Sequence, residues 1–170
     1  YIMEQIKYFP ASKTINRWLK AGYLNNNVFH ETTSGTPQGG IISPLLANIA
    51  LHGMEEALNI KYSKERRKDG THTHRNRSDY VMVRYADDFV ILCKTKEDAY
   101  KVPKLISSYL EKRGLTLAED KTRITHIDDG FDFLGINIKS YFNINRKIVH
   151  TKPSKSSITS FKDKARSIFR

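Results

Sequence analysis

Cysteine is almost absent from this chain, since Cys93 is the only one among 170 residues. A single thiol can form no internal disulfide, which fits a protein that works in a reducing compartment. Cys93 ends an apolar run, and small buried cysteines behave as weakly polar hydrophobic residues. We therefore expect it to be a core residue rather than a nucleophile.

Long apolar runs are absent too. No segment approaches the roughly 20 consecutive apolar residues of a membrane-spanning helix, and no signal-peptide pattern opens the chain. We therefore expect no membrane partner. The length suits one domain with a real core. The first residue is Tyr1, and a helical pattern follows it directly, so we expect the chain to be a piece of a longer protein.

Acidic residues are scarce relative to basic ones. The chain has 18 Asp and Glu against 29 Lys and Arg, which gives a formal net charge of +11. An excess of this size favours a polyanionic partner, most simply nucleic acid. The alternative that charge alone leaves open is a soluble basic protein without such a partner.

The basic residues are densest over residues 61–78, where we predict an exposed loop or hairpin. Such a segment could contact RNA phosphates, or it could simply be a solubilising loop. His72 and His74 lie in the same segment, but no cysteine or acidic partner completes a metal site there. The candidate phosphate contacts are Arg66, Arg67, Lys68, Arg75 and Arg77.

The hydropathy pattern predicts an α+β fold, in which helices pack on one face of an antiparallel sheet. Ser43 and Pro44 predict a hydroxyl cap and the start of a core helix that runs to about residue 60. Residues 96–112 have the pattern of an amphipathic helix, which we expect to end at Gly114. Pro103 lies inside that pattern, where it would kink the helix or shift its start. Other helices are expected over 2–9, 12–21 and 154–169, and strands over 28–33, 115–117, 123–127, 131–138 and 147–151.

Two adjacent aspartates, Asp87 and Asp88, interrupt an apolar run over residues 81–92. Side chains alternate between the faces of a strand, so neighbouring aspartates serve one site only if they occupy a hairpin turn. Their carboxylates would suit Mg²⁺, which prefers one or two carboxylates together with substrate phosphates. Two such ions can run an in-line phosphoryl displacement. The alternative is an ordinary solvated turn.

A loop rich in glycine and proline occupies residues 35–40. Gly39 and Gly40 lack a Cβ, so a nucleotide could approach the backbone closely. The amide of Gln38 offers both a donor and an acceptor, and a helix N-terminus, a natural neighbour for phosphate, follows at once. Taken alone, the loop could equally be an ordinary connection into a capped helix.

Four blocks of this sequence resemble those of group II intron reverse transcriptases. Residues 35–49, GTPQGGIISPLLANI, resemble motif B, and Tyr85-Ala86-Asp87-Asp88 resembles motif C. Residues 115–122, LTLAEDKT, and 131–135, FDFLG, resemble the next two blocks. They occur in family order with family-like spacing. Retron and diversity-generating enzymes resemble the first block less closely. The group II family includes maturases, which bind their intron RNA and assist splicing.

The resemblance implies a reverse-transcriptase palm and a role for each matching residue. Asp87 and Asp88 would be catalytic metal ligands, for Mg²⁺ or Mn²⁺ in its place. Tyr85 and Ala86 would lie near the primer end or the incoming nucleotide. Lys121, otherwise a surface lysine, would lie near the nucleotide. The base-pair pocket would be lined by Pro37, Gln38 and Gly39, and a primer grip, compatible with core packing, would be formed by Phe133, Leu134 and Gly135.

The implied activity is RNA-directed DNA synthesis on an intron RNA template, with a DNA primer and deoxynucleoside triphosphates, together with assistance to splicing. The implied location is the bacterial cytoplasm or an organelle. Residues 1–152 would form the palm, and residues 153–170 the start of the thumb, or maturase domain X. Two alternatives stay open: a maturase with dispensable polymerase activity, and a reverse-transcriptase-like domain of a bacterial defence system.

One expected residue is missing from the pattern. The family has a further catalytic aspartate, in motif A, on a strand before the first helices seen here. Glu4 is the only acid within residues 1–30, and it lies in a helical pattern. We therefore expect the chain to begin after that aspartate and after the fingers, and to be inactive by itself.

Overall fold

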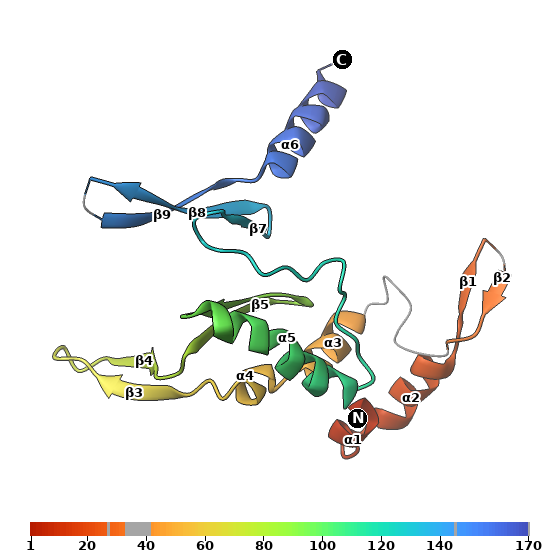
Figure 1. The fold of residues 1–170 in the computed structure, drawn as a ribbon. Coiled ribbons are helices and arrows are strands. Elements are labelled where there is room, and N and C mark those ends of the chain that lie inside the picture. The colour runs from red at the N-terminus through yellow and green to blue at the C-terminus, as the bar shows by residue number, and fades with distance from the viewer. Residues whose placement is uncertain (27, 33–41, 145, 170) are drawn as a thin grey trace. The chain divides into compact units, whose positions relative to one another are not determined.

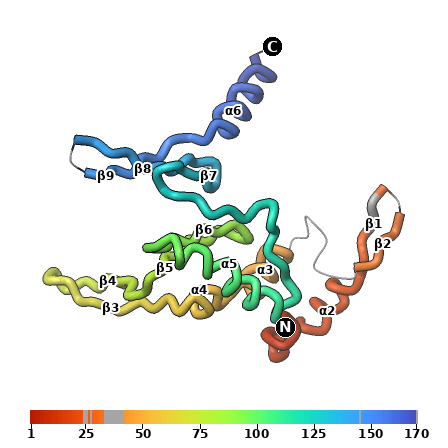
Figure 2. Tube along the Cα trace, viewed as in Figure 1, coloured from red at the N-terminus to blue at the C-terminus, as the bar shows by residue number. Residues whose placement is uncertain are grey.

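The computed structural model describes residues 1–26, 28–32, 42–144 and 146–169 (Figure 1 and Figure 2). These residues form two compact units, Tyr1–Ala118 and Glu119–Arg170. In chain order, the first unit contains α1 (Ile2–Gln5), α2 (Ser12–Lys20), β1 (Tyr23–Asn25), β2 (Val28–His30), α3 (Ser43–Leu51), α4 (Met54–Ala57), β3 (Tyr62–Arg66), β4 (His72–Asn76), β5 (Tyr80–Tyr85), β6 (Asp88–Cys93) and α5 (Lys96–Glu111). The second contains β7 (Phe131–Phe133), β8 (Ile136–Asn143), β9 (Arg146–Pro153) and α6 (Lys155–Ile168).

Every strand pair among the described residues is antiparallel. Hairpins pair β1 with β2, β3 with β4 and β5 with β6, and the second unit holds the three-stranded sheet β7-β8-β9. Helices and antiparallel strands therefore share the chain, which confirms the α+β class. Within the part of the chain that the structure describes, no helix has the length and apolar character needed to cross a bilayer.

The core of the first unit lies between the β5–β6 hairpin and the helices on one of its faces (Figure 1). Met82 is 7% exposed and pairs with Ile91 across the hairpin. Tyr80, Phe89 and Cys93 point to the same side and pack against the buried cluster. That cluster consists of Leu51, Met54, Leu58, Ile60, Met82, Val102, Ile106, Tyr109 and Leu110.

Helix α5 is positioned by a cap at one end and a hydrogen bond near the other. Thr95 is its N-cap and accepts a hydrogen bond from the Asp98 amide at 3.1 Å, an arrangement that satisfies one of the orphan amides of a helix start. The Tyr109 hydroxyl donates to the carbonyl of His52, at the end of α3. Pro103 lies inside the helix, which continues past it.

The prediction of one long helix over residues 43–60 is wrong. Helix α3 ends at Leu51, His52 is extended, and Gly53 has a φ of 93° before α4 begins at Met54. A left-handed glycine stops a helix at little steric cost. The Tyr109 hydroxyl donates a hydrogen bond to the His52 carbonyl at this break. The hydroxyl cap is wrong as well, because Ser43 is the first helical residue and Ile42 is the N-cap.

Two further predictions of strands are wrong. Residues 131–138 are not one strand, because Leu134 and Gly135 form a turn between β7 and β8, with φ values of 50° and 78°. Residues 115–117 and 123–127 are in no strand. The apolar alternation at 115–117 has another cause, since Leu115 and Leu117 pack against the core of the first unit.

In the second unit, the β7–β8 turn is tied to the start of α6. The Ser154 amide and the Ser157 hydroxyl both donate to the carbonyl of Gly135, at 2.8 and 2.9 Å. Ser154 is also the N-cap of α6, since its hydroxyl accepts from the Ser157 amide at 3.1 Å. The side chain of Ser154 is fully buried, so this polar group is both buried and satisfied.

The segment before β7 lies along the edge of β8. The Ile127 carbonyl accepts from the Ser140 amide at 2.9 Å. The Asp128 carboxylate accepts from the Ser140 hydroxyl and from Lys147 Nζ. The hydrogen bond from Lys147, and then that from Ser140, lower the pKa of Asp128 below its ordinary value. Gly130 has a φ of 82°, and a Cβ there would lie 2.9 Å from the Cβ of Lys139.

We predict that Gly130→Ala destabilises the second unit more than Gly70→Ala destabilises the β3–β4 hairpin. Both glycines are left-handed, which costs an alanine about 1–2 kcal/mol, but a Cβ at Gly70 meets nothing within 4 Å. At Gly130 it also collides with Lys139, and overpacking adds about 1–3 kcal/mol. Segment-resolved amide hydrogen exchange measures each effect separately. Equal protection losses would contradict the prediction.

Candidate active site

The two aspartates lie at the turn of the β5–β6 hairpin. Tyr85 ends β5 and pairs with Asp88, the first residue of β6, so Ala86 and Asp87 form the connection. All four residues are exposed. The predicted hairpin is therefore confirmed, and it presents two neighbouring carboxylates at one exposed end.

The backbone of this turn is strained. Ala86 has a φ of 54°, a left-handed conformation that costs a non-glycine residue about 1–2 kcal/mol. Such outliers persist where the surroundings impose them, and they cluster at functional sites. The β5–β6 turn is therefore held in its shape by contacts outside itself.

Arg84 makes those contacts. Its Nη1 atom donates to the Ala86 carbonyl at 2.8 Å and to Asn48 Oδ1, on α3, at 2.9 Å. One guanidinium thus joins the aspartate turn to the helix that follows residues 35–40. Sequence reasoning assigned Arg84 no role. The available signal was its position, because Arg84 alternates with Met82 on the buried side of β5, where a charged group needs partners.

The carboxylates of Asp87 and Asp88 have no ion-pair partner among the described residues. By contrast, Asp79 pairs with Lys94 at 2.8 Å at the far end of the same hairpin. No cluster of three or more histidine, cysteine or acidic side chains suited to a metal occurs in the described parts of the chain. Two free oxygen-donor groups fit Mg²⁺, which completes its coordination with water and substrate phosphates.

Tyr85 lies on the outer face of the hairpin, where its side chain is 66% exposed beside Asp88. Val81, Val83 and Leu92 share that face and are exposed as well. Among the described residues of the first unit, the buried cluster with its helices packs against the opposite face. Tyr85 is therefore accessible to a ligand that approaches the aspartates from the outer side.

The other predicted site residues are only partly described. Pro37, Gln38 and Gly39 lie outside the described residues. Lys121 is exposed in a turn closed by a hydrogen bond of 3.3 Å from the Thr122 amide to the Glu119 carbonyl. It belongs to the second unit, whereas Asp87 and Asp88 belong to the first.

The structure brings Phe133, Leu134 and Gly135 together at the β7–β8 turn of the second unit. Phe133 is half-buried, whereas the side chain of Leu134 is 48% exposed. The left-handed conformation of Leu134 is a second strained position within a sequence block, after Ala86. The hydrogen bonds from Ser154 and Ser157 to Gly135 hold this turn, and sequence reasoning did not foresee them.

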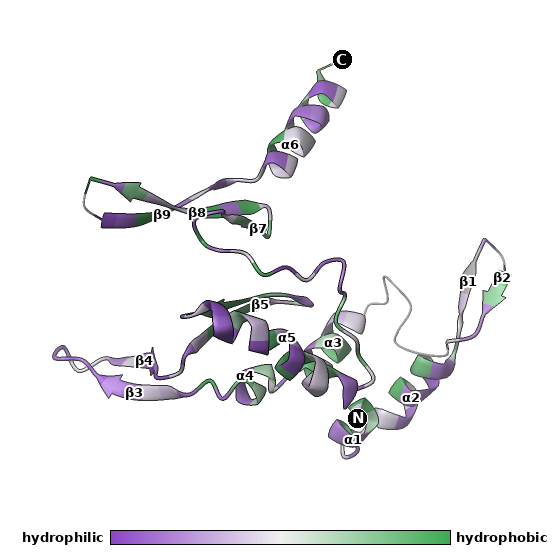
Figure 3. Cartoon of the chain, in the orientation of Figure 1, coloured by the Kyte–Doolittle hydropathy of each residue, from purple (hydrophilic) through white to green (hydrophobic). Residues whose placement is uncertain are grey.

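The basic segment folds as the predicted hairpin, β3–β4, and its two faces differ. Cross-strand pairs place Lys64 with His74 and Arg66 with His72 on one face. On the other face, Glu65 forms ion pairs with Arg75 and Arg77. No acidic side chain pairs with the four residues of the first face within the described ranges. We call that face the cationic face; Figure 3 shows how hydrophilic the hairpin is.

Cys93 lies on the inner side of the β5–β6 hairpin, packed against the core. Burial raises the pKa of its thiol above the ordinary value, which disfavours the reactive thiolate. The expectation that Cys93 packs as a core residue is therefore supported by its position.

Comparison with known proteins identifies the family of the chain. The family model described as reverse transcriptase (RNA-dependent DNA polymerase) matches residues 2–138. The chain therefore belongs to the reverse transcriptase family. It carries the family's α+β palm-type arrangement of antiparallel strands and helices.

Among its relatives is the group II intron-encoded protein LtrA of Lactococcus lactis subsp. cremoris, which is 33% identical over 79% of this chain and 31% of its own length. Protein YkfC of Escherichia coli is 38% identical over 69% of this chain and 35% of its own length. The putative COX1/OXI3 intron 2 protein of Saccharomyces cerevisiae is 28% identical over 80% of this chain and 21% of its own length. The similarity supports a group II intron type of reverse transcriptase. The chain spans a third or less of LtrA and of the yeast protein, and 35% of YkfC.

We predict that Arg84→Ala loosens the aspartate turn. Without the guanidinium, the Ala86 carbonyl and Asn48 lose a shared donor, and hydrogen bonds to charged groups contribute about 1.5–3 kcal/mol. Hydrogen exchange over residues 85–88 should become faster in the variant. Lys94→Ala is the matched control, because it removes one cation from the opposite end of the same hairpin. Equal exchange in both variants would refute this role of Arg84.

Proposed function

We propose that the full-length protein containing this chain is an RNA-directed DNA polymerase encoded by a group II intron. The observation that carries the proposal is the exposed turn of Asp87 and Asp88, whose carboxylates have no ion-pair partner among the described residues, in a chain of the reverse transcriptase family. The substrates would be an intron RNA template, a DNA primer and deoxynucleoside triphosphates. The relatives support an intracellular setting, in a bacterial cytoplasm or an organelle.

In the proposed reaction, the primer 3′-oxygen forms a bond to the α-phosphorus of the nucleotide, and the bond to the leaving pyrophosphate breaks. Bound Mg²⁺, or Mn²⁺ in its place, would lower the pKa of the attacking hydroxyl and offset the charge on the leaving group. Asp87 and Asp88 would hold the ions as oxygen ligands. Arg84 would keep both carboxylates aimed outward by fixing the Ala86 carbonyl.

The other residues of the four sequence blocks would contact the nucleic acid or the nucleotide. Tyr85 and Ala86 would lie against the primer end or the incoming nucleotide, and Lys121 would orient or neutralise phosphate. Pro37, Gln38 and Gly39 would line the base-pair pocket. The turn formed by Phe133, Leu134 and Gly135 would grip the primer. In domain terms, residues 1–152 would be the palm and residues 153–170 the start of the thumb or domain X.

We predict that Asp87→Asn abolishes primer extension by the full-length protein. Loss of a charged metal ligand removes several kcal/mol of transition-state stabilisation, which is about a thousandfold or more at tenfold per 1.36 kcal/mol. Asp79→Asn is the control, because it removes an exposed aspartate from the same hairpin at the end away from the turn. Wild-type extension by Asp87→Asn would overturn the assignment.

The same variant tests the second proposed role, assistance to splicing. RNA binding does not need the metal-bound carboxylates, so full-length Asp87→Asn should still promote intron splicing. Parallel loss of splicing and primer extension would contradict two separable roles.

The chain of residues 1–170 alone should not extend a primer, because its described residues offer only the Asp87 and Asp88 carboxylates at the turn.

The β3–β4 hairpin is the proposed contact for RNA phosphates. The Arg66 side chain lies on the cationic face, beside that of Lys64, and Arg67 and Lys68 follow in the connection to β4. Arg75 and Arg77 are already engaged by Glu65 on the other face. We therefore propose that the cationic face and the connection carry most of the affinity for phosphate, and Arg75 and Arg77 less.

We predict that the double variant Lys64→Gln/Arg66→Gln weakens RNA binding more than Arg75→Gln/Arg77→Gln does. Each double variant removes two positive charges from one hairpin, so long-range electrostatics change equally. Loss of a direct phosphate contact additionally lowers the magnitude of the slope of log K against log[salt] by about 0.7–0.9. A salt titration of RNA binding measures both quantities. Identical slopes for the two variants would disprove the difference between the faces.

A further inference from the structure

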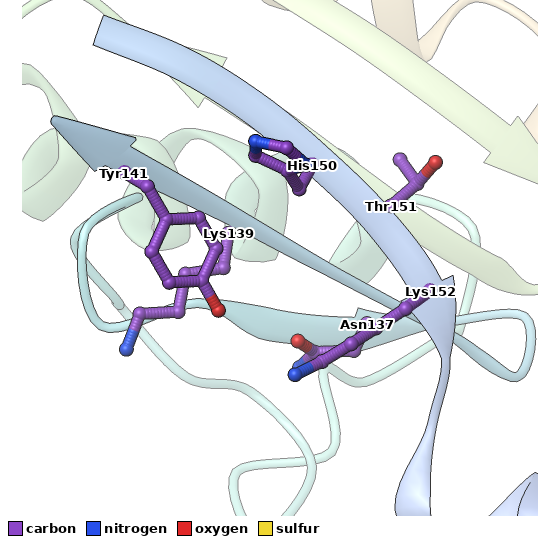
Figure 4. Close-up of a pocket in the computed structure, with 6 residues that line it drawn as sticks. All are labelled: Asn137, Lys139, Tyr141, His150, Thr151 and Lys152. Atoms are coloured by element: carbon purple, nitrogen blue, oxygen red, sulfur yellow. The ribbon is translucent and has the colours of Figure 1, made fainter. Parts of the chain in front are cut away.

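A pocket on the sheet of the second unit is lined by residues that have no role in the proposed catalytic chemistry. It has a volume of about 340 Å³ and lies on β8 and β9 (Figure 4). Its lining consists of Asn137, Lys139, Tyr141, His150, Thr151 and Lys152. We infer that this pocket binds one unpaired nucleotide of a single-stranded nucleic acid, with a base against the Tyr141–His150 pair and phosphate at Lys139 and Lys152.

The register of the sheet explains why these groups meet. Asn137, Lys139 and Tyr141 occupy alternate positions of β8, so their side chains leave the same face. Lys139 pairs with His150, and Asn137 pairs with Lys152. Ladder partners share a face, so the side chains of Asn137, Lys139, His150 and Lys152 lie on one side of the sheet, where Figure 4 draws them around Tyr141.

The aromatic part of the pocket is already organised. The rings of Tyr141 and His150 meet edge to face, with centroids 5.4 Å apart and planes at 81°. Tyr141 is 42% exposed. Flat rings that remain accessible are the platforms on which unpaired bases stack, with little dependence on sequence.

The cationic part is partly held in place as well. The Lys139 ammonium lies 5.6 Å from the centroid of the Tyr141 ring. Its aliphatic stem lies so close to Gly130 that a Cβ there would collide with it. Among the described residues, neither Lys139 nor Lys152 forms an ion pair, so both charges remain available to phosphate.

An acidic group beside the pocket already has a partner. Asp132 lies across from Asn137 on β7, and its Oδ1 atom accepts from Asn137 Nδ2 at 2.7 Å. This bond leaves the Asn137 carbonyl oxygen directed to other donors, such as the edge of a base. The rings and the amide acceptor thus suit a base, and the ammonium groups suit its phosphate.

The volume of the pocket suits a single nucleotide within a strand. About 300 Å³ is the lower end for ligand pockets, so the site suits one small unit rather than a stacked series. A duplex buries the base faces that Tyr141 would contact. The inference rests on the proposed function in one respect, namely that the partner is a nucleic acid.

The test uses the chain of residues 1–170 and a fluorescent single-stranded RNA of mixed sequence, with anisotropy measured across a salt series. We expect Tyr141→Leu to weaken binding about tenfold without changing the salt slope. Tyr141→Phe should bind as the wild type does, because it retains the ring. An abasic strand should bind both Tyr141 variants equally. A Tyr141→Leu effect that persists with the abasic strand would overturn the base contact.

The phosphate contacts are tested by Lys139→Gln/Lys152→Gln, which should lower the salt slope by about 0.7 for each phosphate lost. Lys162→Gln/Lys164→Gln, on α6 of the same unit, removes the same charge away from the pocket. Equal slopes in the two double variants would overturn the inference. Free mononucleotide that competes as well as the strand, or duplex that is equally sensitive to Tyr141→Leu, would also overturn it.

These outcomes are separate from those of the proposed function. Primer extension by the full-length protein depends on Asp87, whereas the binding assay with residues 1–170 depends on the pocket. If Asp87→Asn abolishes extension and the pocket variants bind normally, only the pocket is disproved. If the pocket variants behave as expected and Asp87→Asn extends normally, only the polymerase assignment fails.

Discussion

The alternation of side chains along the β5–β6 hairpin is the constraint on which the rest of the first unit depends. Its inner face is buried against α4 and α5 through Met82 and Ile91, and burying side chains of this size contributes about 1.5–3 kcal/mol each. A slip of one residue would turn these groups to solvent. The same register puts Tyr85 opposite Asp88, so core packing determines where the carboxylates lie.

Arg84 connects that packing to the aspartate turn. It is an inner-face residue by register, but it lies at the end of the strand, where the core gives way to the turn. Its guanidinium can therefore reach both the Ala86 carbonyl and Asn48. The β7–β8 turn is held in a similar way, because Ser154 and Ser157 donate hydrogen bonds to the carbonyl of Gly135. In both turns, a strained left-handed residue is stabilised by hydrogen bonds from outside the turn.

Local patterns were enough to predict features that depend on near neighbours in the chain. The aspartate turn follows from two apolar strands around it, and the end of α5 follows from Gly114, which has a φ of 70°. The predictions that failed depended on distant partners. The break at Gly53 is stabilised by Tyr109, 56 positions later. Leu115 and Leu117 alternate because they pack on a core that local sequence does not reveal. The Leu134–Gly135 turn was hidden because a leucine stands where turns usually carry asparagine or aspartate. Of the candidate site residues, Arg84 was missed for the same reason, since its partner Asn48 lies on another element.

The basic residues show why composition alone could not identify binding surfaces. A net charge of +11 favours a polyanion but does not say which cations are available. Arg75 and Arg77 are part of that excess, yet Glu65 already engages them. Lys147 is similarly occupied by Asp128. Residues that lie opposite each other in paired strands share a face of the sheet. The register of the pairing therefore decides which cations have an acidic partner and which do not. Among the described residues, two cations without an ion pair share one face of a sheet in each unit, Lys64 and Arg66 on β3 and Lys139 and Lys152 on β8 and β9. A phosphate backbone would bind where cations are not already paired, so register rather than total charge decides where nucleic acid can bind.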